Sequence, residues 1–559
     1  MPELNRQQRA AVESSGVVLV IAGPGTGKTK TLTERIVYLL RLEHVPSPQI
    51  LALTFTKKAA EEMRERVAGL VKETPEITTF HGLCYELLGE EPIFASDPQR
   101  FKIIKSLTKP AIFKHLSTRE LGLAISKAKN SVDKQDEKLA KLVSAYDKAL
   151  HEQGLHDFDD LLVDAYAKLQ DESVRPAYQW ILVDEFQDTN RLQYEILKLL
   201  GADDNLFVIG DPNQSIYGFR GASGDIFAQF KTDFPAAQEV TLTANYRSAA
   251  EIVRLSNAIF PDQPALEPKS DVHGQVRAVE VLNEYSEADW VLSEIQKAIG
   301  GGDFLRAVSD DDRGKHRTLR DFAILYRSRS AAQALQKAVE ASGLPYQVVG
   351  DGSPYEKSSV QAVIAVLRAI ETGKTQELAQ LSESSQRKVS ELLQKHKGLS
   401  PTELAEKVIA TLGLAPRREL SQFLATLVRF KALDAALAYF DDIAESGFYD
   451  PAADAITLLT IHASKGLEFP VVFLIGMQEG VLPSDRGDRS EERRLFYVAV
   501  TRAKERLEIT HSTNRGGQPS QVSSFLFDLP LQTTVDPDMQ TQTRRIAKRQ
   551  AKRSQGSLF

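Results

Sequence analysis

The chain has 559 residues, too many for one hydrophobic core and enough for about three to five domains. Its composition, 42% apolar and 26% charged, is typical of a soluble globular protein, and no apolar run approaches the roughly 20 residues that cross a bilayer. The net charge of −7 excludes a global field that attracts nucleic acid, so any such binding must come from local basic and aromatic surfaces. Cys84 is the single cysteine, which excludes an internal disulfide, and "MPELNRQQRA" lacks the apolar region of a signal peptide; both favour a cytoplasmic location.

The first part of the chain alternates short apolar strands with helices. Buried strands are predicted at 17–22, 50–55, 180–185, 206–211 and 239–248, and an amphipathic helix at 57–70. Unbroken apolar strands that alternate with helices indicate a parallel sheet covered on both faces.

A lysine-rich, mostly helical segment at 89–178 interrupts this pattern and is predicted to be a helical insertion. A second set of strands is predicted at 321–328, 456–462, 470–476 and 506–512, and a second mostly helical segment, 371–450, interrupts it. The fold class is therefore α/β, with two parallel-sheet domains that each carry a helical insertion. The expected boundaries are 1–88 with 179–265 for the first domain, 89–178 for its insertion, 266–370 with 451–530 for the second domain, 371–450 for its insertion, and 531–559 for a disordered tail.

"GPGTGKT" (23–29) follows a predicted strand and fits the phosphate-loop pattern GxxxxGK[ST]. Glycines let backbone N–H groups approach phosphate oxygens, and the helix N-terminus adds its positive dipole end. Lys28 is expected to reach the β- and γ-phosphates, and Thr29 to hold Mg²⁺. The alternative, a structural glycine-rich turn, does not account for the flanking strand and helix. The nucleotide-binding set is Gly23, Gly25, Gly27, Lys28, Thr29 and Lys30.

"ILVDEFQD" (181–188) adds two acidic residues to this predicted nucleotide site. Asp184 at a strand end can bind the same Mg²⁺ through water, and Glu185 can take a proton from the attacking water. Alone, the pair could equally be two solvated acids. Downstream of a phosphate loop it predicts a nucleoside triphosphatase that uses ATP and Mg²⁺.

Nine motifs then follow one another in a recognisable order. They are "LNRQQRAAV" (4–12), "AGPGTGKT" (22–29), "LTFTKKAAEEM" (53–63), "TFHGL" (79–83), "VDEFQDTN" (183–190), "GDPNQSIYGFRGA" (210–222), "NYRS" (245–248), "TIHASKGLEFPVV" (460–472) and "EERRLFYVAVTRAKERL" (491–507). In these motifs the chain resembles superfamily 1 DNA helicases of the UvrD/Rep/PcrA type. The resemblance implies an ATP-driven motor that moves 3′ to 5′ on single-stranded DNA, with RecA-like domains 1A and 2A and insertions 1B and 2B. Polarity rests on the resemblance alone.

The resemblance also implies roles around the nucleotide. Gln8 would read adenine, Tyr246 would stack on it, Glu468 would bind the ribose hydroxyl, Gln214 would sense the γ-phosphate, and Arg247 and Arg502 would contact that phosphate. An arginine from a facing domain would make hydrolysis depend on domain closure. Without the other motifs, Arg502 would be a solvated helix residue and Tyr246 a core residue.

Single-strand binding without sequence preference needs aromatic platforms and phosphate contacts. By the same resemblance, Phe55, Tyr217 and Phe219 are the stacking candidates, and His81, Thr460, His462 and Ser464 would contact the backbone or flanking bases. The alternative for a lone histidine or threonine is an ordinary surface residue. No second ligand stands near His462 at metal-ligand spacing, so zinc is not expected there.

The chain departs from the family at several points. Asn213 stands where the family has aspartate, Phe219 replaces a frequent tryptophan, and "SPYEKSS" (353–359) replaces an aromatic-Glu-Arg pattern. The second insertion is short, which leads to the hypothesis that the isolated protein translocates well but unwinds poorly without a partner.

The last residues carry two further signals. A basic run at 544–553 would form one helix face that grips phosphates, or else a solvated tail. "QGSLF" resembles the bacterial sliding-clamp peptide, with Gln555 at the pocket rim and Leu558 and Phe559 in an apolar pocket.

The sequence therefore predicts an ATP-dependent 3′–5′ DNA helicase or translocase, acting in DNA repair or replication restart on single strands and junctions. One alternative is a translocase that mainly strips proteins from single strands. Another is the motor subunit of a helicase–nuclease complex, since only Asp528, Asp536 and Asp538 follow His511 as acids and no nuclease domain is fused. A non-catalytic binding module is disfavoured by Lys28, Asp184, Glu185 and Arg502.

Overall fold

The computed structural model describes residues 4–89, 92–107, 113–133, 136–201, 205–218, 221–222, 224–300, 317–350, 355, 357–373, 378, 389, 399–445 and 449–537. Phe219, Gln555, Leu558, Phe559 and the basic run 544–553 lie outside these residues. The chain divides into two compact units. The first comprises Met1–Gly274 with Arg486–Thr501, and the second Gln275–Asp485 with Arg502–Phe559.

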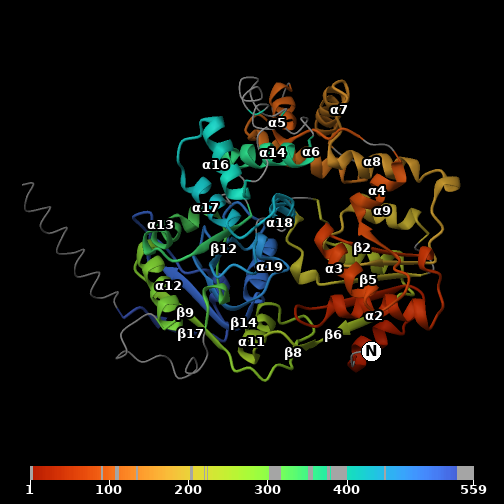
Figure 1. The fold of residues 1–559 in the computed structure, drawn as a ribbon. Helices are drawn as coiled ribbons and strands as arrows, with labels where there is room; N and C mark the ends of the chain where they lie inside the picture. Colours follow the sequence, from red (N-terminus) through yellow and green to blue (C-terminus); the bar gives the residue numbers. More distant parts are fainter. Residues whose placement is uncertain are drawn as a thin grey trace, which may run out of the picture. The chain divides into compact units, whose positions relative to one another are not determined.

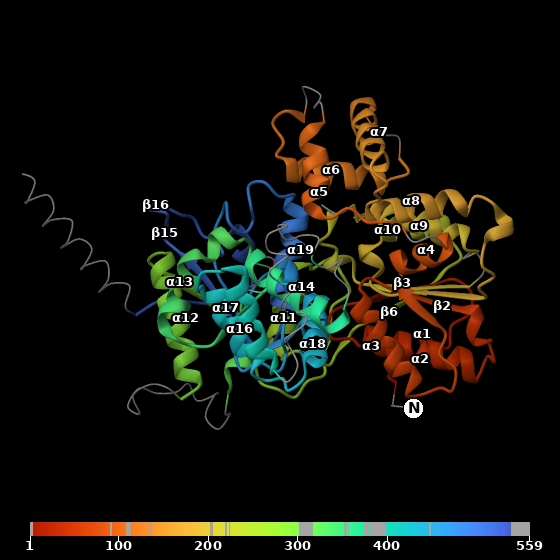
Figure 2. The same ribbon diagram turned by 45° about the horizontal axis from the view of Figure 1, so that its top comes forward.

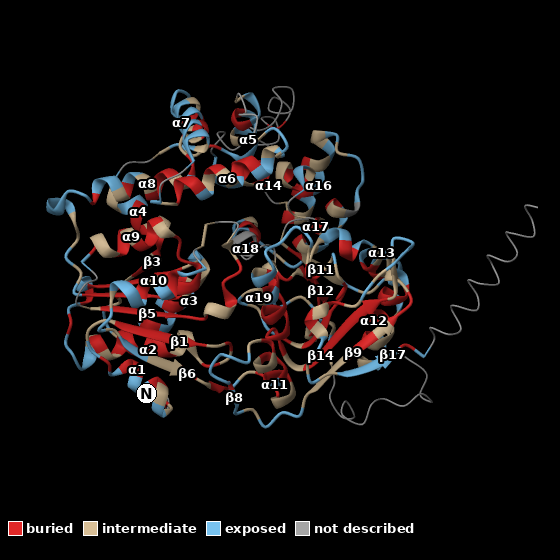
Figure 3. Cartoon of the chain, turned by 180° about the vertical axis from the view of Figure 1, so that it is seen from behind, coloured by how far each residue is buried: buried red, intermediate tan, exposed pale blue. Residues whose placement is uncertain are grey.

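The first unit is built on a six-stranded sheet whose strands are all parallel. Its order is β3 (Glu76–Thr79), β2 (Ile50–Thr54), β4 (Trp180–Val183), β5 (Leu206–Gly210), β1 (Val18–Ala22) and β6 (Gln238–Leu242). The central strands are apolar along their whole length because both faces are buried, as the red strands of Figure 3 show. The predicted α/β class with a parallel sheet is confirmed, and β3 was missed because only alternate residues of it are buried.

Helices cover both faces of this sheet (Figure 1). One face packs against α1 (Arg6–Val12), α2 (Lys28–Arg41) and α3 (Lys57–Ala68); the other packs against α4 (Phe80–Leu88), α8 (Phe158–Lys168), α9 (Arg191–Leu199) and α10 (Ile226–Asp233). The unit also contains α11 (Ala250–Ile259), α19 (Arg489–Val500) and the short pair β7 (Ala244–Asn245) and β8 (Glu267–Pro268). Helix α19 thus groups with the first unit, although its sequence position lies among the strands of the second.

The first insertion consists of α5 (Asp97–Ser106), α6 (Thr118–Lys129) and α7 (Glu137–His151), which gather beside α8 (Figure 2). These helices share their own apolar core, in which Tyr146 is fully buried. Helix α8 instead sends Leu161 and Leu162 into the core of the sheet, so it anchors the insertion to the first unit.

The second unit is built on a seven-stranded sheet, again parallel throughout. Its order is β11 (Tyr346–Val349), β12 (Ile456–Thr460), β10 (Phe322–Tyr326), β13 (Phe469–Leu474), β14 (Ala503–Ser512), β9 (Gln275–Val281) and β17 (Gln532–Val535). Helices α12 (Glu284–Ala298) and α13 (Gln333–Ser342) pack on it, and β15 (Asn514–Arg515) pairs with β16 (Gln518–Pro519). The prediction of disorder from residue 531 is wrong for β17, because Gln532–Val535 pairs with β9 at the sheet edge.

The second insertion is a small helical cluster of α14 (Ser358–Thr372), α16 (Pro401–Leu412), α17 (Arg418–Leu427) and α18 (Leu433–Glu445). Phe423 and Phe440 lie at its centre. Helix α14 packs into this cluster, whereas the expected boundary at 371 assigned it to the sheet domain. Among the helices of the described residues, none has both the length and the apolar content needed to span a membrane.

Candidate active site

The phosphate loop joins β1 to α2 in the first unit. Gly25 and Gly27 adopt left-handed backbone angles, φ +70° and +85°, and α2 begins directly after them at Lys28. The Lys28 ammonium donates to the carbonyls of Ala22 (3.1 Å) and Gly23 (3.4 Å). This combination of glycine loop, helix N-terminus and lysine can hold phosphate groups, with Thr29 in the first turn of the helix.

Gln8 and Tyr246 lie beside this loop and are linked through Asn5. The Gln8 amide donates to the Thr26 carbonyl (3.0 Å) and accepts from the Asn5 backbone N–H (3.1 Å). The Asn5 side chain donates to the Tyr246 hydroxyl (2.9 Å), and Tyr246 is half exposed. The Gln8 amide keeps one donor hydrogen and one acceptor lone pair with which it could read a base. Asn5 was not predicted, although it starts the helix that carries Gln8.

Arg247 is held against the phosphate loop by its neighbours. Tyr246 donates its backbone N–H to Gly25 (2.9 Å), and the Asn245 side chain donates to Pro24 (2.7 Å) while accepting from the backbone N–H of Arg247 (3.0 Å). A Cβ on Gly25 would lie 2.6 Å from the Arg247 Cβ, so only glycine permits this approach. Asn245 is thus a positioning residue that the sequence showed only as part of "NYRS".

Two acids follow β4. Asp184 is buried, and this burial, reinforced by the charge of Glu185, raises its pKa to about 7, against the opposing effect of Lys28. Glu185 has a left-handed backbone (φ 49°) and donates its N–H to the Asp184 carboxylate (2.9 Å). Oxygen ligands from Asp184 and Thr29 suit Mg²⁺, and such a cation would favour the charged form of Asp184.

Gln187 connects this pair of acids to the segment after β5. It is fully buried, its amide donates to the Glu185 carboxylate, and its carbonyl oxygen accepts from the Asp211 backbone N–H (2.9 Å). Asp211 in turn accepts from the Gln214 amide (2.7 Å) and from the backbone N–H of Asn213 (3.0 Å). Gln187 was not predicted, because nothing in "DEFQD" distinguishes a bridging amide from a solvated one.

Helix α19, which groups with the first unit, contacts the segment that runs from Asp211 to Gly218. Arg494 donates to the Ser215 carbonyl (2.7 Å), and a Cβ on Gly218 would lie 2.9 Å from the Glu491 carboxylate. The segment from Asp211 to Gly218 is therefore held by Gln187 at Asp211 and by Arg494 at Ser215, and the glycine at 218 leaves room for Glu491.

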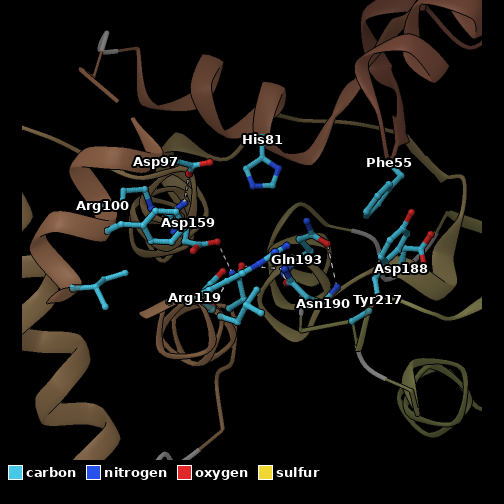
Figure 4. Close-up of a pocket in the computed structure, with 17 residues that line it drawn as sticks. Phe55, His81, Asp97, Arg100, Arg119, Asp159, Asp188, Asn190, Gln193 and Tyr217 are labelled. Atoms are coloured by element: carbon cyan, nitrogen blue, oxygen red, sulfur yellow. Dashed lines mark hydrogen bonds and ion pairs between the residues drawn. The ribbon is translucent and has the colours of Figure 1, made fainter. Parts of the chain in front are cut away.

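A cavity of about 310 Å³ collects three of the predicted DNA-contacting residues. Phe55 and Tyr217 stack on each other, with ring centroids 5.3 Å apart and planes 10° from parallel, and His81 lines the same space (Figure 4). Burial lowers the pKa of His81, which keeps its imidazole neutral near pH 7. Arg100 and Arg119 line the cavity as well, so it offers aromatic faces for bases and cations for phosphates.

A second aromatic pair adjoins His81 and was not predicted. Phe158 is 58% exposed, stacks on Phe94 with centroids 4.6 Å apart, and makes a T-shaped contact with the His81 ring at a centroid distance of 6.4 Å. The only sequence signal was "DFDDLL", in which Asp157 caps α8 and leaves Phe158 at its first position.

Two further residues predicted for the nucleotide site, Arg502 and Glu468, lie in the second unit. Arg502 is buried and donates to the Leu467 carbonyl (3.1 Å), which excludes the solvated-helix alternative for it. Glu468 is exposed and pairs with Lys504 (2.6 Å). These contacts hold the "KGLEF" and "VTRA" motifs together where β13 pairs with β14.

The predicted DNA contacts of this unit differ in accessibility. Thr460 ends β12, where its hydroxyl accepts from the Ala463 N–H (3.2 Å), and His462 follows it, partly exposed. Ser464 is fully buried and donates to the Ile461 carbonyl (2.7 Å). The prediction that Ser464 contacts DNA is therefore not supported, because its hydroxyl closes a turn instead.

Lys30 lies in the first turn of α2, directly after Thr29. It lines a hollow between α2 and α3 with Glu34 and Glu65, and no phosphate-loop glycine lines that hollow. Its assignment to the nucleotide site stays a prediction.

Comparison with known proteins identifies the family. Residues 4–235 match the UvrD/REP helicase N-terminal domain, and residues 240–396 and 372–514 match the UvrD-like helicase C-terminal domain. The chain belongs to the UvrD/REP helicase family. Similar relatives include the ATP-dependent DNA helicase PcrA of Staphylococcus aureus, 29% identical over 643 aligned positions that cover 94% of this chain and 86% of the relative. PcrA of Staphylococcus epidermidis is 28% identical over the same extents.

Family membership agrees with the two parallel-sheet units and with the phosphate loop. The alignment runs over 643 positions although this chain has 559 residues, so the relatives carry segments that this member of the family lacks.

Proposed function

We propose that this protein is an ATP-dependent DNA helicase or single-stranded DNA translocase that hydrolyses ATP with Mg²⁺ in the cytoplasm. In this proposal Lys28 and Arg247 bind the phosphates, Thr29 and Asp184 hold the metal, and Glu185 is the general base. Gln8 and Tyr246 bind the adenine. Arg502 and Glu468 belong to the proposal by analogy with the family alone.

The observation that carries the proposal is the chain of hydrogen bonds from Glu185 through Gln187 and Asp211 to Gln214. Tyr217, stacked on Phe55 in the cavity, stands three residues beyond Gln214. A change at the γ-phosphate would then be transmitted over one short segment to a base stacked on these rings, with Phe158 as a further platform.

Movement from 3′ to 5′ and a role in DNA repair or replication restart are part of the proposal by analogy with the family. A second candidate function is a translocase that strips proteins from single strands. It is favoured by the small α14–α18 cluster and by the segments that this chain lacks relative to PcrA. Streptavidin displacement from end-labelled single strands, compared with unwinding of a tailed duplex, separates the two functions.

The test of the proposed function is steady-state ATP hydrolysis with and without oligo(dT). Wild-type protein should be stimulated by the oligonucleotide, Lys28→Ala should lose nucleotide binding, and Glu185→Gln should bind ATP but turn it over at least about 100-fold more slowly. Hydrolysis that oligo(dT) leaves unchanged would contradict a DNA-driven motor, and the absence of hydrolysis would support a non-catalytic binding module.

A sliding clamp is the one protein partner in the proposal, through Gln555, Leu558 and Phe559. Pull-down of the clamp by full-length protein, but not by a variant that lacks the last five residues, is the expected result. Equal capture of the clamp by both forms would contradict the proposal that these residues bind it.

A further inference from the structure

A cluster of His151, His156 and Asp160 lies where α7 ends and α8 begins, and it is separate from the nucleotide site. Their ligand atoms all lie within 4.8 Å of one another, with His151 Nε2 3.4 Å and His156 Nδ1 4.0 Å from the same oxygen, Oδ2 of Asp160. A tetrahedral zinc ion with bonds of about 2.1 Å places its ligand atoms about 3.4 Å apart. The His151–Asp160 distance already matches that spacing, whereas the His156 ring must move closer to complete the site.

The carboxylate of this cluster is held in place by groups other than the histidines. Asp160 Oδ1 accepts from the buried Lys129 ammonium (2.5 Å), and Oδ2 accepts from the Asp157 backbone N–H (2.8 Å) in the capping box of α8. Ligands oriented by such outer contacts bind metals more tightly than mobile ones.

The local charge also favours a cation. The Lys129 ammonium faces three carboxylates, those of Asp147, Asp157 and Asp160, so it leaves negative charge in a largely buried region. Asp164, one turn further along α8, adds to it: burial and the charge of Asp160 raise the pKa of Asp164, and both histidines act on it in the opposite direction. The His151 and His156 side chains are 46% and 37% exposed, which provides a path for an ion and room for water.

We propose that His151, His156 and Asp160 bind one divalent transition-metal ion, Zn²⁺ being the best match, with water as the fourth ligand. Two imidazoles and one carboxylate form a ligand set that suits Zn²⁺ and disfavours Mg²⁺, which prefers oxygen ligands. The bound ion ties the end of α7 to the first turn of α8. Because Phe158 belongs to that turn, the ion would also fix an aromatic platform beside His81.

The experiment uses tag-free full-length protein, treated with a chelator and then dialysed, in the absence of ATP and Mg²⁺. Zn²⁺ affinity is measured by competition with a chromophoric chelator, and Co²⁺ is added separately to record its visible absorption. Wild-type protein should bind one Zn²⁺ and give the intense visible bands of four-coordinate Co²⁺. His151→Ala and His156→Ala should each weaken Zn²⁺ binding by about tenfold or more.

Two matched variants complete the test. His115→Ala removes an exposed histidine of the same insertion, and Asp184→Asn removes the proposed magnesium ligand; both should bind Zn²⁺ as wild type does. Zn²⁺ should also raise the melting temperature of wild type but not of the His151 and His156 variants. Equal Zn²⁺ affinity in wild type, His151→Ala and His156→Ala, or no stoichiometric binding by wild type, would overturn the proposal whatever the outcome of the ATPase assays.

Discussion

The side-chain oxygen of Gln187 accepts a hydrogen bond from the backbone N–H of Asp211, at 2.9 Å, inside the first unit. The same amide donates to the carboxylate of Glu185. A Cβ on Gly210 would lie 2.4 Å from the Gln187 oxygen, so the glycine before Asp211 is needed for this contact. One buried side chain therefore joins the proposed general base to the segment that carries Gln214 and Tyr217.

Gln187→Ala should separate ATP binding from turnover. The substitution removes the group that orients Glu185, and misplacement of a catalytic group costs up to about 100-fold in rate. We expect kcat with saturating oligo(dT) to fall by about 10–100-fold, while affinity for a fluorescent ATP analogue stays near the wild-type value.

Gln478→Ala is the matched control for that variant. Gln478 is equally buried and donates to Ser512 and Ser520 in the second unit, and neither partner belongs to the proposed nucleotide site. It should lose about 1–3 kcal/mol of stability, as Gln187→Ala does, with little change in kcat. Similar kcat losses in both variants would attribute the effect to destabilisation.

Gly25→Ala should weaken nucleotide binding by displacing Arg247 and Asn245. The new Cβ would lie 2.6 Å from the Arg247 Cβ, in addition to the left-handed backbone cost of about 1 kcal/mol. Gly89→Ala carries nearly the same backbone angle, φ +68°, with nothing within 4 Å of the added Cβ. In a fluorescent-nucleotide titration, Gly25→Ala should bind the nucleotide about tenfold or more weakly than wild type, whereas Gly89→Ala should bind it as wild type does. Equal affinities of the two variants would show that the close approach of Arg247 to Gly25 is not needed.

Tyr217→Ala should weaken binding of oligo(dT). Stacking on one aromatic contributes about 1–3 kcal/mol per base, which corresponds to roughly 5- to 150-fold in Kd. Tyr217→Phe keeps the ring and should retain most of the affinity in a fluorescence-anisotropy titration. If both variants bind alike, the Phe55–Tyr217 pair is not a base platform.

Asp184→Asn should stabilise the nucleotide-free protein in a pH-dependent way. Burial raises the pKa of Asp184 from 3.8 to about 7 in the folded state, so the unfolded chain releases this proton at lower pH than the folded protein does. The resulting cost in stability grows as pH rises from about 4 to about 7 and is complete above that range. The variant should therefore melt at least about 2 °C above wild type at pH 8, with a gain that shrinks toward pH 5.

Asp262→Asn, which changes an exposed carboxylate, is the control for this pH series. Its melting temperature should follow wild type at every pH. A pH-independent gain for Asp184→Asn would contradict the burial argument.

The sequence predicted the parts of the fold that depend on local pattern. β1 and β5 are unbroken apolar runs, and the phosphate loop is a contiguous motif, so both could be found without tertiary information. β17 was not predicted, because "QTTV" is polar and forms a strand only by pairing with β9. β9 itself was not predicted, because it combines the buried Ala278, Val279 and Val281 with the partly exposed Arg277 and Glu280.

The site residues could likewise be predicted only where the chemistry is visible in a local motif. Lys28, Asp184 and Glu185 carry their chemistry in sequence, whereas Gln187, Asn245 and Phe158 acquire their positions from contacts with residues far along the chain or from the cap of a helix. Ser464 shows a further limit of the sequence: its hydroxyl is buried, and a motif position gives no information about burial.

The most direct test of the account is the effect of nucleotide on DNA affinity. The Kd for oligo(dT) is measured with and without a non-hydrolysable ATP analogue, in wild type and in Gln214→Ala. Coupled sites must influence each other's affinity reciprocally, typically by about 5- to 150-fold. We predict such a shift in wild type and its loss in Gln214→Ala, with nucleotide affinity in the absence of DNA retained. An unchanged Kd in wild type, or the same shift in both proteins, would contradict the claim that the segment from Asp211 to Tyr217 couples the two sites.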